Sequence, residues 1–425
     1  MEVQIERLGI NGEGVFKCQE GELLNKVGFV SFALPGESVE VEILKNKSNF
    51  VEAKLNKVNT VSPHRKNPEC PYFYKCGGCD VQHMDKVTEH QFKKSKVEDT
   101  IRKIAKLGDF KLDKIVDIND FHYRNKMVFP FGMAGNECVL GMYEKNSRKI
   151  VNIDFCLLAN EKINEILRLS KEFFENSKKY IEFIKSKTLK HLVVRSINDK
   201  SLITIVSSKK VDLQDYCDYV TEKLKNIGIS QIIGDSDDEI LSGKYTYLTG
   251  IENIEIEEFG LKYSIDNRGF LQVNNEIKKE IYSQILEWIS DTDNVIDAYS
   301  GAGLLSGIIS KKCKSVIGIE INQSASKSAQ NMSKFNGLHN TMFVCDDVKN
   351  RIAECLNQNS DPVLILDPAR SGCESVVLDK ILESNLPKKI IYLSCNVATL
   401  ARDLIKLKNY YTITSSIGYN SLLVL

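Results

Sequence analysis

The stretch NVIDAYSGAGLLS, residues 294–306, decides the fold. A short apolar run, NVIDAY (294–299), leads directly into two closely spaced glycines, Gly301 and Gly303, and an apolar helical stretch follows. Glycines between a strand and a helix let the backbone approach a ligand closely. The stretch therefore predicts the first strand, the ligand loop and the first helix of an α/β unit.

Four further apolar runs follow at intervals that leave room for helices. They are SVIGIEI (315–321), TMFVCD (341–346), PVLILDP (362–368) and KIIYLSC (389–395). An amphipathic helix is predicted before the first strand, at 276–289, because Ile277, Ile281, Ile285 and Trp288 share one side. This alternation is typical of a doubly wound parallel sheet. The two tail segments, 410–417 and 420–425, are compatible with a closing antiparallel pair.

Acidic residues end three of these strands. Glu320 lies 17 residues after Gly303, and Asp346 and Asp367 end the next two strands. The carboxyl ends of parallel strands meet at one edge, where such sheets bind ligands and where an acidic residue can accept hydrogen bonds from ribose hydroxyls. Each acid alone could equally be a helix cap or a solvated strand end. Together they favour an adenosine-containing cofactor.

The loop pattern narrows the choice of cofactor. Position 306 is Ser, so the dinucleotide pattern G-x-G-x-x-G is absent, and the chain has no G-x-x-x-x-G-K-[ST] motif for ATP. An S-adenosylmethionine fold of class I fits better. Cys395 sits between the fifth strand and the following helix, where the helix dipole favours a thiolate nucleophile. A lone cysteine at a strand end is more commonly a core residue, and the nearby cofactor mouth is what favours the functional interpretation.

Length and composition limit the number of domains and the class of protein that the chain can belong to. The chain has 425 residues, 57 Lys+Arg and 57 Asp+Glu, so its formal net charge is zero. This length predicts two to four domains, and the balance argues against a protein that mainly coats a polyanion. No apolar run approaches the ~20 residues of a membrane helix, and the first residues lack an export signal. A cytoplasmic, reducing location is expected.

The N-terminal 60 residues read as short alternating strands separated by NGEG, EGE and PGE turns. This spacing predicts a small β-barrel of OB type. Such barrels often bind single-stranded nucleic acid, although a barrel can also serve only as a packing module. A helix with many basic residues is predicted at 85–107, facing either solvent or RNA.

Twelve cysteines are many for a chain without an export signal, and a disulfide framework is not expected. Eight are scattered, and most of these are predicted to be small core residues. Cys70, Cys76 and Cys79 form C-x5-C-x2-C in a Pro/Gly-rich loop, a spacing that usually holds metal. Zinc and a [4Fe–4S] cluster both fit four thiolates. The residues alone do not distinguish zinc from a [4Fe–4S] cluster, and they do not identify Cys156 as the fourth ligand.

These motifs resemble the uracil-5-methyltransferase family that modifies 23S ribosomal RNA and transfer RNA, along nearly the whole chain. IERLGINGEGVFKC (5–18) resembles the opening of its TRAM domain, and PECPYFYKCGGCDVQH (68–83) resembles its iron–sulfur loop. HYRNKMVFPFG (122–132), RGFLQVNNEI (268–277), LILDPARSG (364–372) and LSCNVATLARDL (393–404) are further family segments. The resemblance implies a TRAM barrel at 1–60, a central α+β domain at 61–262 and a Rossmann-like methyltransferase domain at 263–425.

The resemblance also implies a site. S-adenosyl-L-methionine is expected against Gln272, Tyr299, Gly301, Gly303, Glu320, Asp346 and Asp367, with Asp346 near the adenine. Cys395 matches the nucleophile that adds to C6 of uracil, and Asp367 has a second possible role at the uracil edge. GMYEKNSRKIVNIDFCLL (141–158) matches the segment that brings Cys156 to a [4Fe–4S] cluster. The cluster loop favours 23S rRNA over tRNA as partner, and the oligomeric state stays open, with a monomer the simplest expectation.

The tail departs from the family pattern. Its final residues read YYTITSSIGYNSLLVL, and Asn420 falls near the Glu that serves as general base. Asn cannot take a proton at neutral pH. Val397 and Ala369 also stand where the family usually has Pro. The leading hypothesis is an active RNA uracil-5-methyltransferase that uses another base. The alternatives are a catalytically impaired RNA-binding paralogue and a zinc-containing structural protein.

Overall fold

The computed structural model describes residues 1–19, 21–234, 236, 239–419 and 422–425, and Asn420 lies outside this part of the chain. The chain divides into two compact units. The first contains residues 1–97 and 140–153, and the second contains residues 98–139 and 154–425. All twelve cysteines lie in this part of the chain and are free thiols. Within the part of the chain described, no helix is both long and apolar enough to cross a bilayer.

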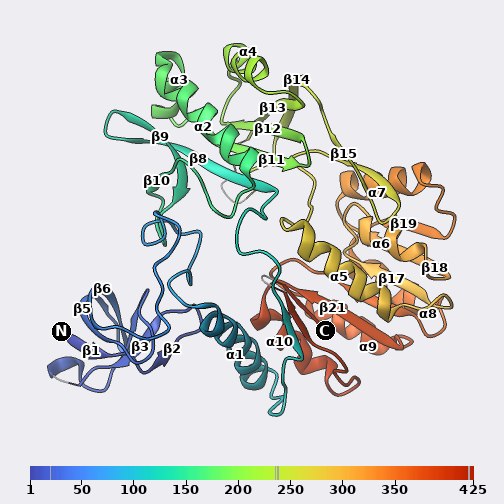
Figure 1. Ribbon diagram of the computed structural model, residues 1–425. Helices are drawn as coiled ribbons and strands as arrows, with labels where there is room; N and C mark the ends of the chain where they lie inside the picture. The colour runs from blue at the N-terminus through green and yellow to red at the C-terminus, as the bar shows by residue number, and fades with distance from the viewer. Residues whose placement is uncertain (20, 235, 237–238, 420–421) are drawn as a thin grey trace. The chain divides into compact units, whose positions relative to one another are not determined.

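A six-stranded sheet opens the first unit (Figure 1). Its order is β1-β5-β6-β4-β3-β2, and β1 also lies against β3, so the sheet curls around its own core. Val30, Val39 and Val51 are fully buried in that core because alternate residues of each strand face inward. The predicted run of short N-terminal strands is therefore confirmed. The strands are β1 (Glu2–Gln4), β2 (Arg7–Leu8), β3 (Gly14–Lys17), β4 (Val27–Val30), β5 (Ser38–Asn46) and β6 (Phe50–Thr60).

The cysteine-containing loop follows β6 and has neither helix nor strand between residues 61 and 80, as predicted. Its first turn is tied to the sheet by Arg65, which donates two hydrogen bonds, of 2.6 and 2.7 Å, to the fully buried carboxylate of Glu37. Phe73 anchors the middle of the loop by packing edge-on against Phe32. The loop then leads into α1 (Lys86–Ile104), close to the predicted helix at 85–107. Strands β9 (Glu137–Tyr143) and β10 (Ile150–Asn152) form an antiparallel pair.

The second unit contains a mixed sheet in the order β8-β11-β12-β13-β14, in which only β12 and β13 are parallel neighbours. A separate hairpin, β15-β16, follows it. The elements are β8 (Lys126–Ala134), α2 (Glu161–Asn176), α3 (Lys178–Lys185), β11 (Leu189–Ile197), β12 (Lys200–Ser207), α4 (Gln214–Lys223), β13 (Ile227–Ile233), β14 (Lys244–Gly250), β15 (Ile254–Glu258) and β16 (Leu261–Ile265).

The C-terminal sheet has the order β19-β18-β17-β20-β21-β23-β22-β7. Its first five strands are parallel, and β23 runs antiparallel to β21. The strand order reverses between β17 and β20, and such a switch point is where doubly wound sheets bind ligands. The strands are β17 (Asn294–Ala298), β18 (Ser315–Glu320), β19 (Thr341–Cys345), β20 (Val363–Leu366), β21 (Lys389–Ser394), β22 (Ile417–Tyr419), β23 (Leu422–Val424) and β7 (Lys114–Val116).

Helices cover both faces of this sheet (Figure 1). Ile277, Ile281 and Ile285 of α5 pack with the helix α6 over one face, as the sequence pattern predicted, and Trp288 is partly buried beside them. The doubly wound α/β prediction is therefore confirmed. An antiparallel tail pair is also observed, but the prediction of a strand at 410–417 is wrong in its bounds, because the strand covers Ile417–Tyr419. The second strand, Leu422–Val424, lies within the predicted 420–425. The helices are α5 (Asn275–Trp288), α6 (Leu304–Ser310), α7 (Gln323–Phe335), α8 (Val348–Asn357), α9 (Ser375–Glu383) and α10 (Val397–Leu407).

Two sequence interpretations are refined. Cys345 is exposed, whereas most of the scattered cysteines, Cys18 and Cys217 among them, are buried as predicted. Cys345 ends β19, which is the edge strand of its sheet and has only one neighbour. On the basic helix α1, Lys93 and Arg102 form i,i+4 ion pairs with Glu89 and Glu98 at 2.5 and 2.9 Å. These pairs are compatible with a solvated helix face, although the helix keeps an excess of basic residues, with six Lys or Arg and three Asp or Glu.

Candidate active site

The loop after β17 is held in an uncommon backbone conformation. Tyr299 has a φ of +72°, and Gly301 and Gly303 have φ values of +55° and +77°. The N–H groups of Tyr299 and Ser300 both donate to the carbonyl of Ile319 at 3.0 Å, which fixes the loop on the neighbouring strand β18. A non-glycine residue in the left-handed region is strained, and such strain concentrates at ligand sites.

The two glycines of this loop have different reasons to be glycine. A Cβ on Gly303 would stand 2.6 Å from the Cβ of Ala329 and 2.8 Å from the ring of Phe343, so this glycine allows α6 to pack closely. A Cβ on Gly301 would meet nothing within 4 Å, which leaves open space beside the backbone. Ser300, which sequence reasoning missed, has a buried hydroxyl without a partner among the described residues. This hydroxyl lies against β18, because a Cβ on Gly318 would stand 2.9 Å from it.

Glu320 connects two of the loops at the carboxyl edge. One carboxylate oxygen accepts from the N–H of Gly301 at 2.9 Å, and the other accepts from the N–H of Asn322 at 2.7 Å. Each oxygen retains a second lone pair that a ribose hydroxyl can use. Asp346 follows β19 and accepts from the side chain of Asn350 and the N–H of Asp347, which holds the pKa of Asp346 below its usual range. Asp346 is therefore anionic and faces solvent.

Asp367 and Asp297 are two aspartates whose charged forms are destabilised. Burial raises the pKa of Asp367 to about 7, and the neighbouring charge of Asp297 adds to the effect. Burial also raises the pKa of Asp297 to about 6, against the opposing hydrogen bond of 2.5 Å from the hydroxyl of Ser306. The N–H of Asp367 donates to the carbonyl of Ala298 at 3.4 Å, so the two carboxyls stand at the switch point of the sheet. Asp367 therefore carries a proton for part of the time near neutral pH.

Cys395 is exposed and directly precedes Asn396, whose side chain caps α10 by accepting from the N–H of Ala398 at 3.0 Å. The loop after Asp367 is joined to this turn, because the carbonyl of Arg370 accepts from Asn396 at 3.3 Å and from Thr399 at 3.2 Å. Asn396 and Thr399 thus join the start of α10 to the loop after Asp367, and Cys395 lies directly before this junction.

The segment that carries Gln272 is fixed from the other sheet of the same unit. Lys126 donates to the carbonyl of Asn267 at 2.6 Å, and Arg195 donates to the carbonyl of Gly269 at 2.6 Å. Asn125 donates to the carbonyl of Gln272 at 2.9 Å. These three bonds connect β8, Asn125 directly before it, and β11 to residues 267–272. Sequence reasoning did not identify them, because their donors lie more than seventy residues before their acceptors.

The loop that carries Cys70, Cys76 and Cys79 lies in the first unit and is held by backbone hydrogen bonds. The thiol of Cys76 accepts from the N–H of Gly78 at 3.4 Å, and the N–H of Gly77 donates to Tyr143 of β9 at 2.9 Å. Cys70 and Cys79 are half-buried on the same loop. Among the residues that the structure describes, no three His, Cys, Asp or Glu side chains converge as for a metal ion. Cys156 belongs to the second unit.

Comparison with known proteins decides the family. The family described as tRNA (Uracil-5-)-methyltransferase matches residues 88–421, and the TRAM domain matches residues 1–55. The chain belongs to the tRNA (uracil-5-)-methyltransferase family. The relatives of this methyltransferase include an uncharacterised RNA methyltransferase of Clostridium acetobutylicum, 32% identical over 98% of this chain and 91% of its own length. A similar protein of Listeria innocua is 32% identical over 95% of this chain and 90% of its own. The enzyme class and RNA as partner are thereby confirmed.

A solved structure shares the fold of this methyltransferase. It is the Pyrococcus abyssi tRNA (uracil-54, C5)-methyltransferase in complex with S-adenosyl-L-homocysteine, with a TM-score of 0.78 and 21% identity. The match covers 100% of this chain and 99% of that one. At this identity the similarity extends to the fold, and it confirms the predicted combination of an N-terminal β-sheet domain, a central part and a C-terminal methyltransferase sheet.

Proposed function

We propose that this methyltransferase transfers a methyl group from S-adenosyl-L-methionine to C5 of a uracil in RNA, through a covalent bond between Cys395 and C6. The observation that supports it most is the position of Cys395 at the carboxyl edge of a doubly wound sheet. It directly precedes Asn396, which together with Thr399 is hydrogen-bonded to the loop after Asp367. Family membership supplies the reaction class. The target base must leave its stack to reach a pocket of this kind.

The chemistry follows from the reactivity of uracil. C5 is a poor nucleophile until the Cys395 thiolate adds to C6, which breaks the C5–C6 double bond and places an enolate on the ring. When bound, S-adenosyl-L-methionine supplies an electrophilic methyl group for C5. Removal of the C5 proton by a base and elimination of the Cys395 thiolate then restore the double bond. A partly protonated Asp367 can donate a hydrogen bond to the enolate oxygen.

The cofactor site that we propose uses the groups at the carboxyl edge. Glu320 offers its remaining lone pairs to the ribose, and Asp346 stands where the third strand ends. The open space beside Gly301 leaves room for a ligand next to Tyr299. Gln272 completes the site from its fixed segment. Gly303 contributes by packing.

We further propose a [4Fe–4S] cluster on Cys70, Cys76 and Cys79, with Cys156 as the fourth ligand on resemblance alone. The N–H to sulfur hydrogen bond from Gly78 supports this proposal, since hydrogen bonds to sulfur tune such clusters. Anaerobic purification, with iron and acid-labile sulfide measured per chain, tests it. Zinc without sulfide would contradict it and would support the structural alternative.

The proposed substrate is 23S rRNA, with tRNA as the lesser alternative, and the enzyme is proposed to act as a cytoplasmic monomer. We also propose the division into domains at 1–60, 61–262 and 263–425. Incubation with tritiated-methyl cofactor and transcripts of 23S rRNA or tRNA tests the substrate. Tritium in 5-methyluracil from 23S rRNA supports the proposal, and methylation confined to tRNA would overturn the rRNA assignment.

A catalytically impaired paralogue is the second candidate, because Asn420 falls near the position of the family base. Under this alternative, an RNA adduct through Cys395 accumulates and survives denaturant, while no methylated product is released. Absence of both adduct and product would exclude the enzyme mechanism altogether.

A further inference from the structure

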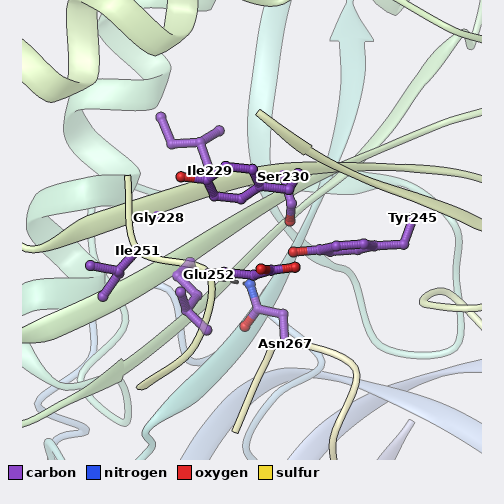
Figure 2. Close-up of a pocket in the computed structure, with 9 residues that line it drawn as sticks. Gly228, Ile229, Ser230, Tyr245, Ile251, Glu252 and Asn267 are labelled. Carbon is purple, nitrogen blue, oxygen red and sulfur yellow. Dashed lines mark hydrogen bonds between the residues drawn. The ribbon is translucent and has the colours of Figure 1, made fainter. Parts of the chain in front are cut away.

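Polar side chains from distant segments meet at more than one place in the second unit. One is a hollow on the mixed sheet beside Tyr245 and Asn267, with room for about one water molecule (Figure 2). The amide of Asn267 donates there to the carbonyl of Leu202 and the hydroxyl of Thr204, so these contacts serve the packing of the sheet. Another lies at the carboxyl edge of the C-terminal sheet, where α10 is bound to the loop after Asp367.

One face of α10 follows that loop residue by residue. Asn396, Thr399 and Arg402 are spaced three residues apart, so they lie on the same side of the helix. The first two donate to the carbonyl of Arg370, at 3.3 and 3.2 Å. Arg402 and the residue after it continue this contact along the loop.

Arg402 and Asp403 bind the next backbone groups of the loop. Nη2 of Arg402 donates to the carbonyls of Ser371 and Cys373 at 2.9 and 3.0 Å. Oδ2 of Asp403 accepts from the N–H of Cys373 at 2.9 Å. Nε of Arg402 donates to Oδ1 of Asp403 at 2.9 Å, which joins the two side chains. We call these two side chains, with the backbone of residues 371–373, the clamp.

Asp403 is the buried centre of the clamp. Its side chain is 1% exposed, and it also accepts from the hydroxyl of Tyr392 on β21 at 2.7 Å. Burying a carboxylate is costly unless hydrogen bonds and a cation compensate for the lost water. Both of its oxygens have such partners, and a buried polar network whose members are all satisfied favours one geometry.

Gly372 allows the two side chains to come close to the loop. Its φ is +74°, and an added Cβ would stand 2.7 Å from Nη2 of Arg402 and 2.8 Å from Oδ2 of Asp403. A larger residue at this position would therefore push the clamp apart.

The clamp lies between two groups that the proposed reaction uses. Cys395 stands directly before the bound face of α10, and Asp367 lies four residues before Ser371. In that reaction both side chains must face one uracil ring at the same time. A misplacement of about 1 Å can slow such a reaction about 100-fold, and side chains around a site are what holds its reacting groups in place.

We propose that Arg402 and Asp403 are positioning residues, which fix the loop after Asp367 relative to Cys395 without touching the substrate. The proposal rests on the proposed function, because it assigns support for that same reaction. It predicts that breaking the clamp slows the chemical step and leaves the affinities for cofactor and RNA unchanged.

The test measures how fast Cys395 forms its adduct with RNA that contains 5-fluorouracil, with the full-length protein and saturating S-adenosyl-L-methionine. Arg402→Ala breaks the clamp, and the side chain of Arg402 is 51% exposed, so the variant is expected to fold. Lys406→Ala is the matched control. Lys406 is another cation of α10 that pairs with an aspartate, but its bonds go to Ser375 and Asp379 of α9.

Arg402→Ala should slow adduct formation at saturating RNA by about 10- to 100-fold. The Kd values for S-adenosyl-L-homocysteine and RNA should change by less than about twofold, and Lys406→Ala should keep both the rate and the Kd values. Asp403→Asn keeps an oxygen for the N–H of Cys373 but cannot form the ion pair. It should slow the adduct in the same way, and it provides the test if Arg402→Ala does not fold.

Urea unfolding separates positioning from stability. A merely structural role would lower the free energy of unfolding of Arg402→Ala and leave the adduct rate of the folded protein unchanged, and that result would overturn the proposal. A loss confined to the Kd values, or equal slowing in Lys406→Ala, would overturn it as well. If the wild type forms no adduct, the proposed function fails and this proposal fails with it. An adduct in the wild type with an unchanged rate in Arg402→Ala overturns the positioning role alone.

Discussion

Replacing Asp367 with Asn should make the protein more stable, and most of all at alkaline pH. The ordinary pKa of an aspartate is 3.8, and burial with the charge of Asp297 raises that of Asp367 to about 7. The folded state therefore holds a proton more tightly than the unfolded state. The stabilisation from this proton is complete below pH 4 and is lost as the pH rises through 7.

The size of the effect follows from these two pKa values. Linkage gives a cost of Asp367 ionisation of about 1.5 kcal/mol at pH 5 and about 4 kcal/mol at pH 8. Asparagine has nearly the same shape and cannot ionise, so it avoids this cost. The stabilisation by Asp367→Asn should therefore be about 2–3 kcal/mol larger at pH 8 than at pH 5.

The fluorescence of Trp288 can report specifically on the unfolding of the C-terminal sheet. It is the only tryptophan of the chain and packs against the core of the C-terminal sheet. Its fluorescence during urea unfolding, at pH 5 and pH 8, reports the stability of the part that contains Asp367. Asp291→Asn, which changes an exposed aspartate, is the matched control. A variant that is no more stable than wild type at pH 8, or a difference independent of pH, would refute the reasoning.

Three further predictions concern neighbouring features. Gly303→Ala should lower the free energy of unfolding by about 2 kcal/mol or more, because the added Cβ would clash with its neighbours. Gly301→Ala should lower it by only about 1 kcal/mol, because the left-handed backbone is its only source of strain. Equal losses for the two variants in urea unfolding would contradict the packing role of Gly303. Asn125→Ala should weaken S-adenosyl-L-homocysteine binding about tenfold in calorimetry, since it frees the carbonyl of Gln272, and an unchanged Kd would contradict this. Cys76→Ser should remove most of the iron from anaerobically purified protein, and full retention would exclude Cys76 as a ligand.

The C-terminal sheet could be predicted closely from the sequence. All five parallel strands lie within one or two residues of the apolar runs, because strands buried on both faces must be continuously apolar. The positions of Glu320, Asp346 and Asp367 at the carboxyl edge could be predicted as well, because each ends one of these apolar runs. Cys345 was the exception in its burial, since the position of β19 at the sheet edge is a property of strand order and not of local pattern.

The long-range polar contacts could not be predicted. The hydrogen bonds of Asn267 to Leu202 and Thr204 join segments more than sixty residues apart, and no periodicity of the sequence marks them. The bonds from Lys126 and Arg195 to residues 267–269 likewise join segments that are distant in sequence. Such contacts depend on tertiary packing, which brings the segments together only in the folded chain.

The most direct test of the central claim is a search for a covalent bond between Cys395 and RNA that contains 5-fluorouracil, in the presence of S-adenosyl-L-methionine. C5 of 5-fluorouracil carries fluorine in place of hydrogen, so no base can remove a proton from it. The adduct is therefore trapped after methyl transfer, whichever group acts as base. We expect a denaturant-resistant complex that carries one methyl group and is lost in Cys395→Ala. Methylated RNA without any such complex, or a complex that persists in Cys395→Ala, would contradict this expectation.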